Sequence, residues 1–77
     1  MVYQYYIMEL QTYQDGSHGH IVHFAWDNDE QQARLKGESK YYEILAAAAV
    51  STLPAHGVAL LNWKGEPIMN KCYEHRA

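Results

Sequence analysis

The sequence has little of what stabilises or targets many small proteins. Its single cysteine, Cys72, excludes a disulfide within the chain and is typical of a reducing compartment. No segment approaches the ~18 apolar residues of a membrane-spanning helix, and the first residues lack the basic and apolar regions of a signal peptide. Lys and Arg number 6 against 9 Asp and Glu, without a basic cluster. We therefore expect neither a membrane nor a nucleic acid as a partner.

The length and the aromatic content indicate one small domain that associates with other chains. A chain of 77 residues is near the lower limit for an independent hydrophobic core, so we expect a single α+β domain over residues 1–77. Domains of this size commonly need a disulfide, a metal or a partner chain, and self-association is the expected supplement here. The 7 Tyr and 2 Trp agree with this, because aromatic side chains contribute strongly to interfaces.

Two hairpin patterns flank one helical pattern. Residues 2–13 and 19–26 predict strands on either side of Asp15-Gly16, and residues 57–62 and 67–73 predict strands around Lys64-Gly65. Pro67 at a strand start indicates an edge position. The predicted fold is α+β in the order β-β-α-β-β, a four-stranded, mainly antiparallel sheet with one helix packed on one face. The strand order stays open, as does the register of the second hairpin, which decides whether Ile68 or Met69 points inward.

The helix is predicted from about residue 28 to residue 51 or 52. Asp27 and Glu30 have capping-box spacing at its start, and Pro54 stops it. Gly37 divides it into a polar first part and a packed second part, and is the place for a kink. Residues 46–49 are four consecutive alanines. We expect their methyl groups to face the sheet and to let the helix approach it closely.

The two faces of the first hairpin follow from its turn. If Asp15-Gly16 is a two-residue loop, Tyr5 pairs with Trp26, and the same register fixes all the other residue pairs of the hairpin. A compact aliphatic set then faces the helix: Tyr6, Met8, Leu10, Ile21 and Ala25. The other face is too large for one helix to cover, and exposed apolar faces of this kind are usually interfaces. We predict an interface or ligand face made by Tyr5, Ile7, Glu9, His20, Val22, Phe24 and Trp26.

Candidate chemical groups are few, and each has a simpler structural explanation. His18 and His20 share one face of a strand and could begin a metal site, but His23 points to the opposite face. Cys72 and His75 also face opposite ways, which does not suit a thiol–imidazole pair. We therefore predict no catalytic residue, no cofactor-binding residue and no metal ligand, in a protein that is not an enzyme. Whether His18 and His20 ever meet a metal stays open.

Short segments spread along the chain carry a resemblance to other proteins. They are residues 5–9 (YYIME), 40–42 (KYY), 45–51 (LAAAAVS), 53–56 (LPAH) and 71–75 (KCYEH). With these segments the chain resembles a group of short uncharacterised proteins from phages and prophages of gut bacteria, often encoded near tail or baseplate genes. The resemblance covers most of the chain apart from about residues 31–37. It implies no activity and no site residues, only that the chain is a small phage-encoded protein.

Two functions are consistent with these features. The first is a non-enzymatic structural or accessory phage protein that acts as a homodimer and through protein–protein contacts of its open aromatic sheet face. Such a protein is expected in the cytoplasm of the bacterial host or on the virion, bound to host or virion proteins. The alternative is a phage inhibitor or sequestering module whose face binds a host protein or a small ligand. The sequence leaves the identity of the partner and the number of subunits open.

Overall fold

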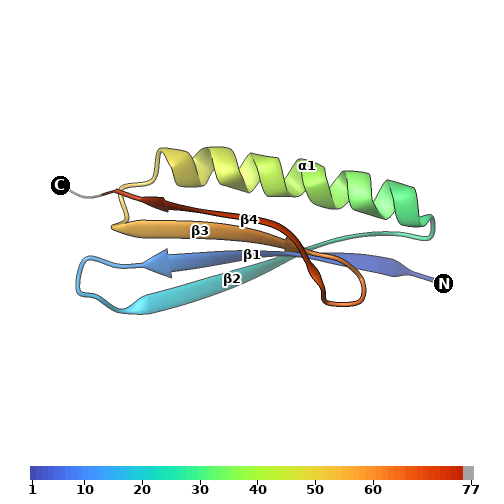
Figure 1. The fold of residues 1–77 in the computed structure, drawn as a ribbon, viewed down its shortest axis with the longest axis horizontal. Helices are drawn as coiled ribbons and strands as arrows, with labels where there is room; N and C mark the ends of the chain where they lie inside the picture. The colour runs from blue at the N-terminus through green and yellow to red at the C-terminus, as the bar shows by residue number, and fades with distance from the viewer. Residues whose placement is uncertain (76–77) are drawn as a thin grey trace.

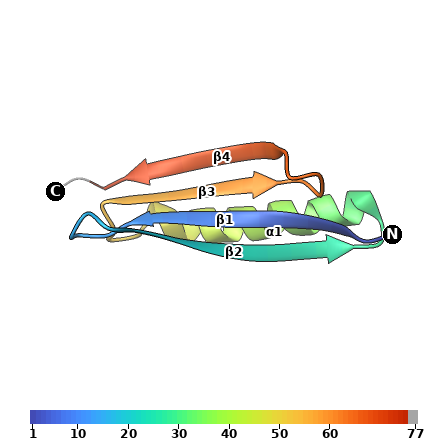
Figure 2. The same ribbon diagram turned by 90° about the horizontal axis from the view of Figure 1, so that it is seen from below.

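The computed structural model describes residues 1–75 and contains one antiparallel sheet with one helix across one face (Figure 1). The elements in chain order are β1 (Tyr3–Thr12), β2 (His18–Asp27), α1 (Glu30–Ala49), β3 (Ala55–Leu61) and β4 (Pro67–Glu74). The strand order is β2-β1-β3-β4, so β2 and β4 form the two edges of the sheet (Figure 2). The predicted α+β fold in the order β-β-α-β-β is confirmed, and so is the edge position of Pro67.

The first hairpin turns through three residues instead of two. The backbone N–H of Tyr13 donates to the carbonyl of Ser17 at 2.8 Å, and Gly16 donates to Tyr13 at 2.9 Å, with Gly16 in the left-handed region at φ 85°. The Asp15 carboxylate accepts from the backbone N–H and the hydroxyl of Ser17 at 2.9 and 2.6 Å, which stabilises the loop. The extra loop residue shifts the pairing by one position, so Tyr5 pairs with Ala25 and not with Trp26.

Because of this shift, the prediction of which β1 side chains face the helix is wrong. Tyr5 and Ile7, predicted on the open face, are 1% and 0% exposed and pack beneath α1. The β1 residues predicted for the core point away from the helix instead, and they are partly or largely exposed: Tyr6, Met8 and Leu10. Ile21, also predicted for the core, is exposed. The prediction for Ala25 is confirmed, because it packs against the core.

The helix α1 is shorter at both ends than predicted. Asp29, and not Asp27, is its N-cap, and the Asp29 carboxylate accepts from the backbone N–H of Gln32 at 3.0 Å. Asp27 lies one step outside, where it accepts from the backbone N–H of Asp29 at 2.9 Å and pairs with Lys36 at 2.8 Å. The N-cap was therefore predicted two residues too early, and the N–H of Asp29 donates to Asp27 and not to a capping-box side chain. The C-terminal end comes at Ala49, before the predicted residues 51–52.

The helix α1 buries about one residue per turn against the sheet. The run of four alanines is not the part of α1 that approaches the sheet most closely. The buried positions recur every three or four residues: Ala33, Gly37, Tyr41, Ile44 and Ala48. Only Ala48 of the four consecutive alanines is buried, since four successive residues span more than a full helical turn. The close approach occurs at Gly37, where a Cβ would lie 3.0 Å from the Cβ of Tyr5. The helix continues through Gly37 as one element.

The second hairpin resolves the register that the sequence left open. Met69 pairs with Leu60 and therefore shares its helix-facing side, while Leu61 lies on the opposite side. A register shift between Leu60 and Leu61 places Pro67 opposite Leu61. Ile68 is the additional residue of this bulge and packs partly against the core.

Candidate functional site

The open face of the sheet, on the side away from α1, carries rows of neighbouring side chains across β2, β1 and β3. The pairing aligns three rows: Phe24, Tyr6 and Leu61; Val22, Met8 and Ala59; His20, Leu10 and Gly57. The rings of Tyr6 and Phe24 meet edge to face at 5.7 Å with an interplanar angle of 71°. Side chains become smaller from β2 towards β3. The larger side chains of this face therefore lie along β2 (His20, Val22, Phe24 and Trp26), which we call the β2 ridge, and the smallest lie along β3 (Ala55, Gly57 and Ala59).

The β2 ridge is apolar, exposed and almost free of charge. Phe24 and Trp26 are each 57% exposed, which is high for the two largest side chains of a strand. Among the strand residues of the open face there is no Lys or Arg, and Glu74 is the one carboxylate. The exposed strand side chains of this face are therefore mainly apolar or uncharged.

The predicted site residues divide between two environments. Those on β2 lie together on the open face, as predicted: His20, Val22, Phe24 and Trp26. The three from β1, which are Tyr5, Ile7 and Glu9, lie beneath α1 on the other side of the sheet. Their places on the open face are taken by residues that the sequence reading missed: Tyr6, Met8 and Leu10. Ser17 after Asp15-Gly16 was the available signal, because an Asp–Ser side-chain contact favours the longer loop.

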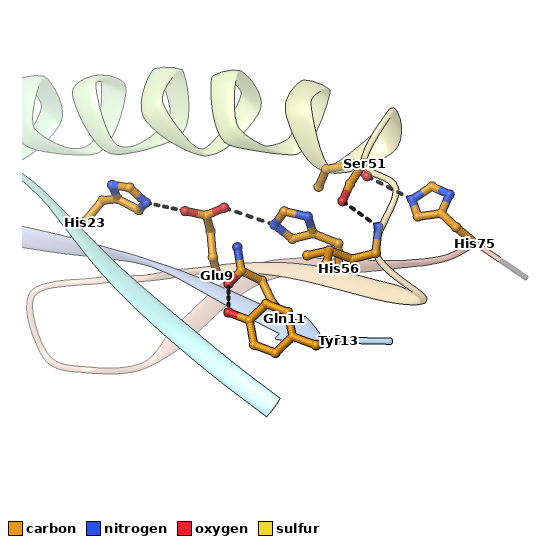
Figure 3. Close-up of polar contacts among 9 residues, drawn as sticks. Glu9, Gln11, Tyr13, His23, Ser51, His56 and His75 are labelled. Carbon is orange, nitrogen blue, oxygen red and sulfur yellow. Dashed lines mark hydrogen bonds and ion pairs between the residues drawn. The ribbon is translucent and has the colours of Figure 1, made fainter. Parts of the chain in front are cut away.

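Beneath α1, Glu9 is hydrogen-bonded between two histidines from the flanking strands (Figure 3). His23 on β2 pairs with Ile7, and His56 on β3 pairs with Gln11, so both histidines lie diagonal to Glu9. Glu9 Oε2 lies 2.5 Å from His23 Nε2, and Glu9 Oε1 lies 3.0 Å from His56 Nε2. The side chains of Glu9 and His56 are 13% and 8% exposed. We call these three residues the Glu9 cluster.

The Glu9 carboxylate is held in its ionised form. Burial raises its pKa, but the hydrogen bonds from His23 and His56 and their charges act in the opposite direction and prevail, so the pKa lies below the usual range. An ionised carboxylate only accepts, so His56 Nε2 carries the proton that it donates to Glu9. The Nδ1 atom of His56 is buried and has no hydrogen-bond partner within the described chain. The cluster therefore fixes one tautomer of a buried imidazole.

This arrangement does not suit catalysis or metal binding. A general base must reach its substrate, whereas both oxygens of Glu9 are occupied and the side chain is covered by α1. Because the carboxylate stands between the two imidazoles, their Nε2 atoms do not converge on one point. Within residues 1–75, no group of three or more His, Cys, Asp and Glu side chains is arranged to hold a metal ion. The Glu9 cluster links β2, β1 and β3 under the helix, which is a structural role.

The other candidate groups are also separated or occupied. His18 Nδ1 lies 3.1 Å from the hydroxyl of Thr12 at the start of β2. His75 stacks on Tyr73 and its Nε2 lies 3.0 Å from the carbonyl of Ala48 at the end of α1. Cys72 is exposed on β4, and its sulfur contacts the carbonyl of Tyr73 at 3.9 Å. The thiol of Cys72 and the ring of His75 are thus not paired.

One pocket lies on the outer side of α1, away from the open face. It is a depression lined by Gln31, Arg34, Leu35 and Glu38, and the Arg34–Glu38 ion pair at 2.8 Å crosses it.

In the part of the chain that the structure describes, no helix is long and apolar enough to span a membrane. No protein-family model, curated protein or solved structure shows a significant similarity to this chain.

Proposed function

We propose that the protein is a non-enzymatic accessory protein that acts by binding protein surfaces, those of a second copy first, through its open sheet face. The observation that carries this proposal is the β2 ridge, where Phe24 and Trp26 are each 57% exposed on a face whose strand residues include no Lys or Arg. Soluble chains seldom leave such an apolar face uncovered, because its burial is the main source of association free energy.

The area of the open face and the distribution of its large and small side chains support a second copy of the chain as its binding partner. Strands of 7 to 10 residues, four across, span roughly 500–600 Å² at ~3.4 Å per residue and ~4.8 Å between strands. Stable interfaces bury about 800 Å² of accessible surface per partner, so a dimer must use nearly the whole face. A two-fold axis lets the β2 ridge of each copy lie over the small side chains of Ala55, Gly57 and Ala59 of the other. The near absence of charge avoids repulsion between identical faces.

The biological setting belongs to the same proposal. The resemblance of residues 5–9, 40–42, 45–51, 53–56 and 71–75 to short phage and prophage proteins supports a phage-encoded protein. Its place is then the cytoplasm of the host cell or the virion. Host or virion proteins are the further partners that an apolar sheet face of this kind fits.

The experiment compares two glutamate substitutions at equally exposed positions. Phe24→Glu places a carboxylate on the β2 ridge, and Leu35→Glu places one on the outer side of α1, where Leu35 is also 57% exposed. The molar mass is measured by sedimentation equilibrium from micromolar to millimolar concentration, with circular dichroism to check the fold. We expect Phe24→Glu to raise the dimer dissociation constant by about tenfold or more, because the interface would bury an unpaired charge. Leu35→Glu should leave it unchanged.

Two results would overturn the proposal of self-association. One is a folded monomer of the unsubstituted protein at millimolar concentration. The other is an equal effect of Phe24→Glu and Leu35→Glu on the dissociation constant. A folded monomer would leave the β2 ridge bare and favour the sequestering function, in which a host protein covers the same face.

A further inference from the structure

The two edges of the sheet differ in how they are protected against pairing with another strand. Exposed edges are usually blunted by proline, lysine, bulges or shortness. The β4 edge has three of these features, since it begins at Pro67, follows a bulge at Leu60/Leu61 and carries the exposed Lys71. The β2 edge has 10 residues without Pro, Lys, Arg or Glu. Its one charged residue is Asp27 at the very end, so β2 is an unprotected edge.

The hydrogen-bond pattern identifies the backbone groups that this edge offers. Tyr13 donates to Ser17 at the start of the hairpin, and bonded and non-bonded pairs alternate along an antiparallel ladder. The residues of β2 whose N–H and C=O groups point away from β1 are then the even-numbered ones: His18, His20, Val22, Phe24 and Trp26. The carbonyl of Trp26 agrees with this, because it lies 3.4 Å from Lys36 Nζ outside the sheet. That contact caps one end of the edge and leaves the centre open.

We propose that two copies of this chain join along β2, antiparallel and around a two-fold axis at Val22, to form one continuous eight-stranded sheet. In this register Val22 faces Val22 of the second copy, and His20 faces Phe24. The outward groups of the two strands then meet on both sides of Val22, in about eight backbone hydrogen bonds, because Lys36 Nζ already contacts the carbonyl of Trp26 in each copy. A register shifted by two residues loses one bonded pair, so the strand is self-complementary around Val22.

A second copy fits this edge without a steric or electrostatic obstacle. The helix contacts β2, β1 and β3, so it lies near β1. In the joined sheet, β1 and its symmetry mate are three strand spacings apart, about 14 Å, which is wider than the 8–10 Å between packed helices. The terminal Asp27 lies next to residue 17 of the second copy, outside its β2, so no like charges meet along the strand.

This pairing goes beyond the proposed function because it uses the backbone of an edge and not the side chains of the face. It also enlarges that face. The two β2 ridges become neighbours in the middle of one surface, with Phe24 of each copy beside His20 of the other. The joined face spans roughly 1,000–1,200 Å² by the same strand spacings, which is more than the ~800 Å² that a standard partner covers. An edge-joined dimer is therefore a platform for a further protein.

The first test is amide hydrogen exchange on the unsubstituted protein at low and high concentration. The amides of His20, Val22 and Phe24 point away from β1 and gain a partner in the joined sheet, so we expect their exchange to slow by about tenfold or more as concentration rises. The outward amides of Asn70 and Cys72 on β4 are the control and should stay fast. Protection of the β4 amides instead would overturn the proposal. So would fast exchange of the β2 amides in a sample that sedimentation shows to be dimeric.

The second test separates edge pairing from packing of the open faces. In a Cys72→Ser background, Val22→Cys places a thiol on the two-fold axis, with Cα atoms about 5.5 Å apart across the joined strands, within disulfide range. Leu10→Cys, on the same face of β1, places thiols about 14 Å or more apart in an edge-joined dimer. We expect mild oxidation to cross-link the Val22→Cys protein and not the Leu10→Cys protein. Equal cross-linking of both, or of Leu10→Cys alone, would overturn edge pairing while leaving face packing in place.

Discussion

Replacing Glu9 by glutamine tests whether the Glu9 cluster stabilises the sheet through its charge. Glu9 accepts from His23 at 2.5 Å and from His56 at 3.0 Å in a site where its own side chain is 13% exposed. Hydrogen bonds to a charged group contribute about 1.5–3 kcal/mol, and those between neutral groups about 0.5–1.5 kcal/mol. The glutamine amide can accept from one imidazole only and presents a donating NH2 group to the other, so one bond is weakened and the other is lost or reversed by a change of tautomer. At ~1 kcal/mol for each bond, the loss is about 2 kcal/mol. The neutral amide is easier to bury, so we expect Glu9→Gln to lower the free energy of unfolding by about 1–2 kcal/mol at pH 7.

The effect has a definite dependence on pH. The pKa of Glu9 is lowered in the folded protein, against the opposing effect of burial, by its hydrogen bonds with His23 and His56. A lowered pKa means that the carboxylate stabilises the fold above the pKa of an unfolded glutamate, about 4.3, and that this contribution is lost as the pH falls through the folded value. The difference in the free energy of unfolding between wild type and Glu9→Gln should therefore be present above the unfolded pKa and disappear as the pH falls below about 4.

The assay is urea unfolding followed by circular dichroism from pH 7 to pH 3, at one fixed protein concentration because self-association adds to the apparent stability. Glu43→Gln is the matched control, since it makes the same chemical change on the exposed side of α1 and should leave stability nearly unchanged. Glu9→Leu should cost more than Glu9→Gln, because it leaves the Nε2 proton of His56 buried without an acceptor. A Glu9→Gln protein as stable as wild type at pH 7, or a difference that persists unchanged to pH 3, would refute this account.

Two further substitutions test how α1 is positioned. Gly37→Ala would bring a Cβ to 3.0 Å from Tyr5 Cβ and 3.3 Å from Leu60 Cδ1, and we expect overpacking of about 1–3 kcal/mol to exceed the ~1 kcal/mol gained in helix propensity. A stabilised Gly37→Ala protein in thermal unfolding would contradict the close approach of α1 to the sheet. Asp29→Ala removes the acceptor for the backbone N–H of Gln32 and should cost about 1 kcal/mol, whereas Asp29→Asn should retain most of that stability. Equal losses for the two variants would argue against capping by the side chain.

The candidate site shows how one local uncertainty propagates through a sheet. The β2 half of the open face was predicted correctly, since Phe24 and Trp26 alternate with Ala25 whatever the pairing. The β1 half was inverted because one additional loop residue moves every β1 side chain to the other face. Neither the partners of Glu9 nor the exposure of Leu10 could be predicted until that loop was known.

The sequence by itself determined the order β-β-α-β-β, because the signals for it are local. Gly16 and Gly65 adopt φ of 85° and 81° at the two turns, and Pro54 follows the end of α1. The register of the first hairpin followed from its three-residue loop, whereas the strand order and the burial of the Glu9 cluster were decided only by the tertiary structure. Those features depend on which strands meet after the helix crosses the sheet, and a glycine that costs helix stability locally, Gly37, is what lets that crossing be close. Packing between segments distant in the chain therefore decided which apolar face was left exposed.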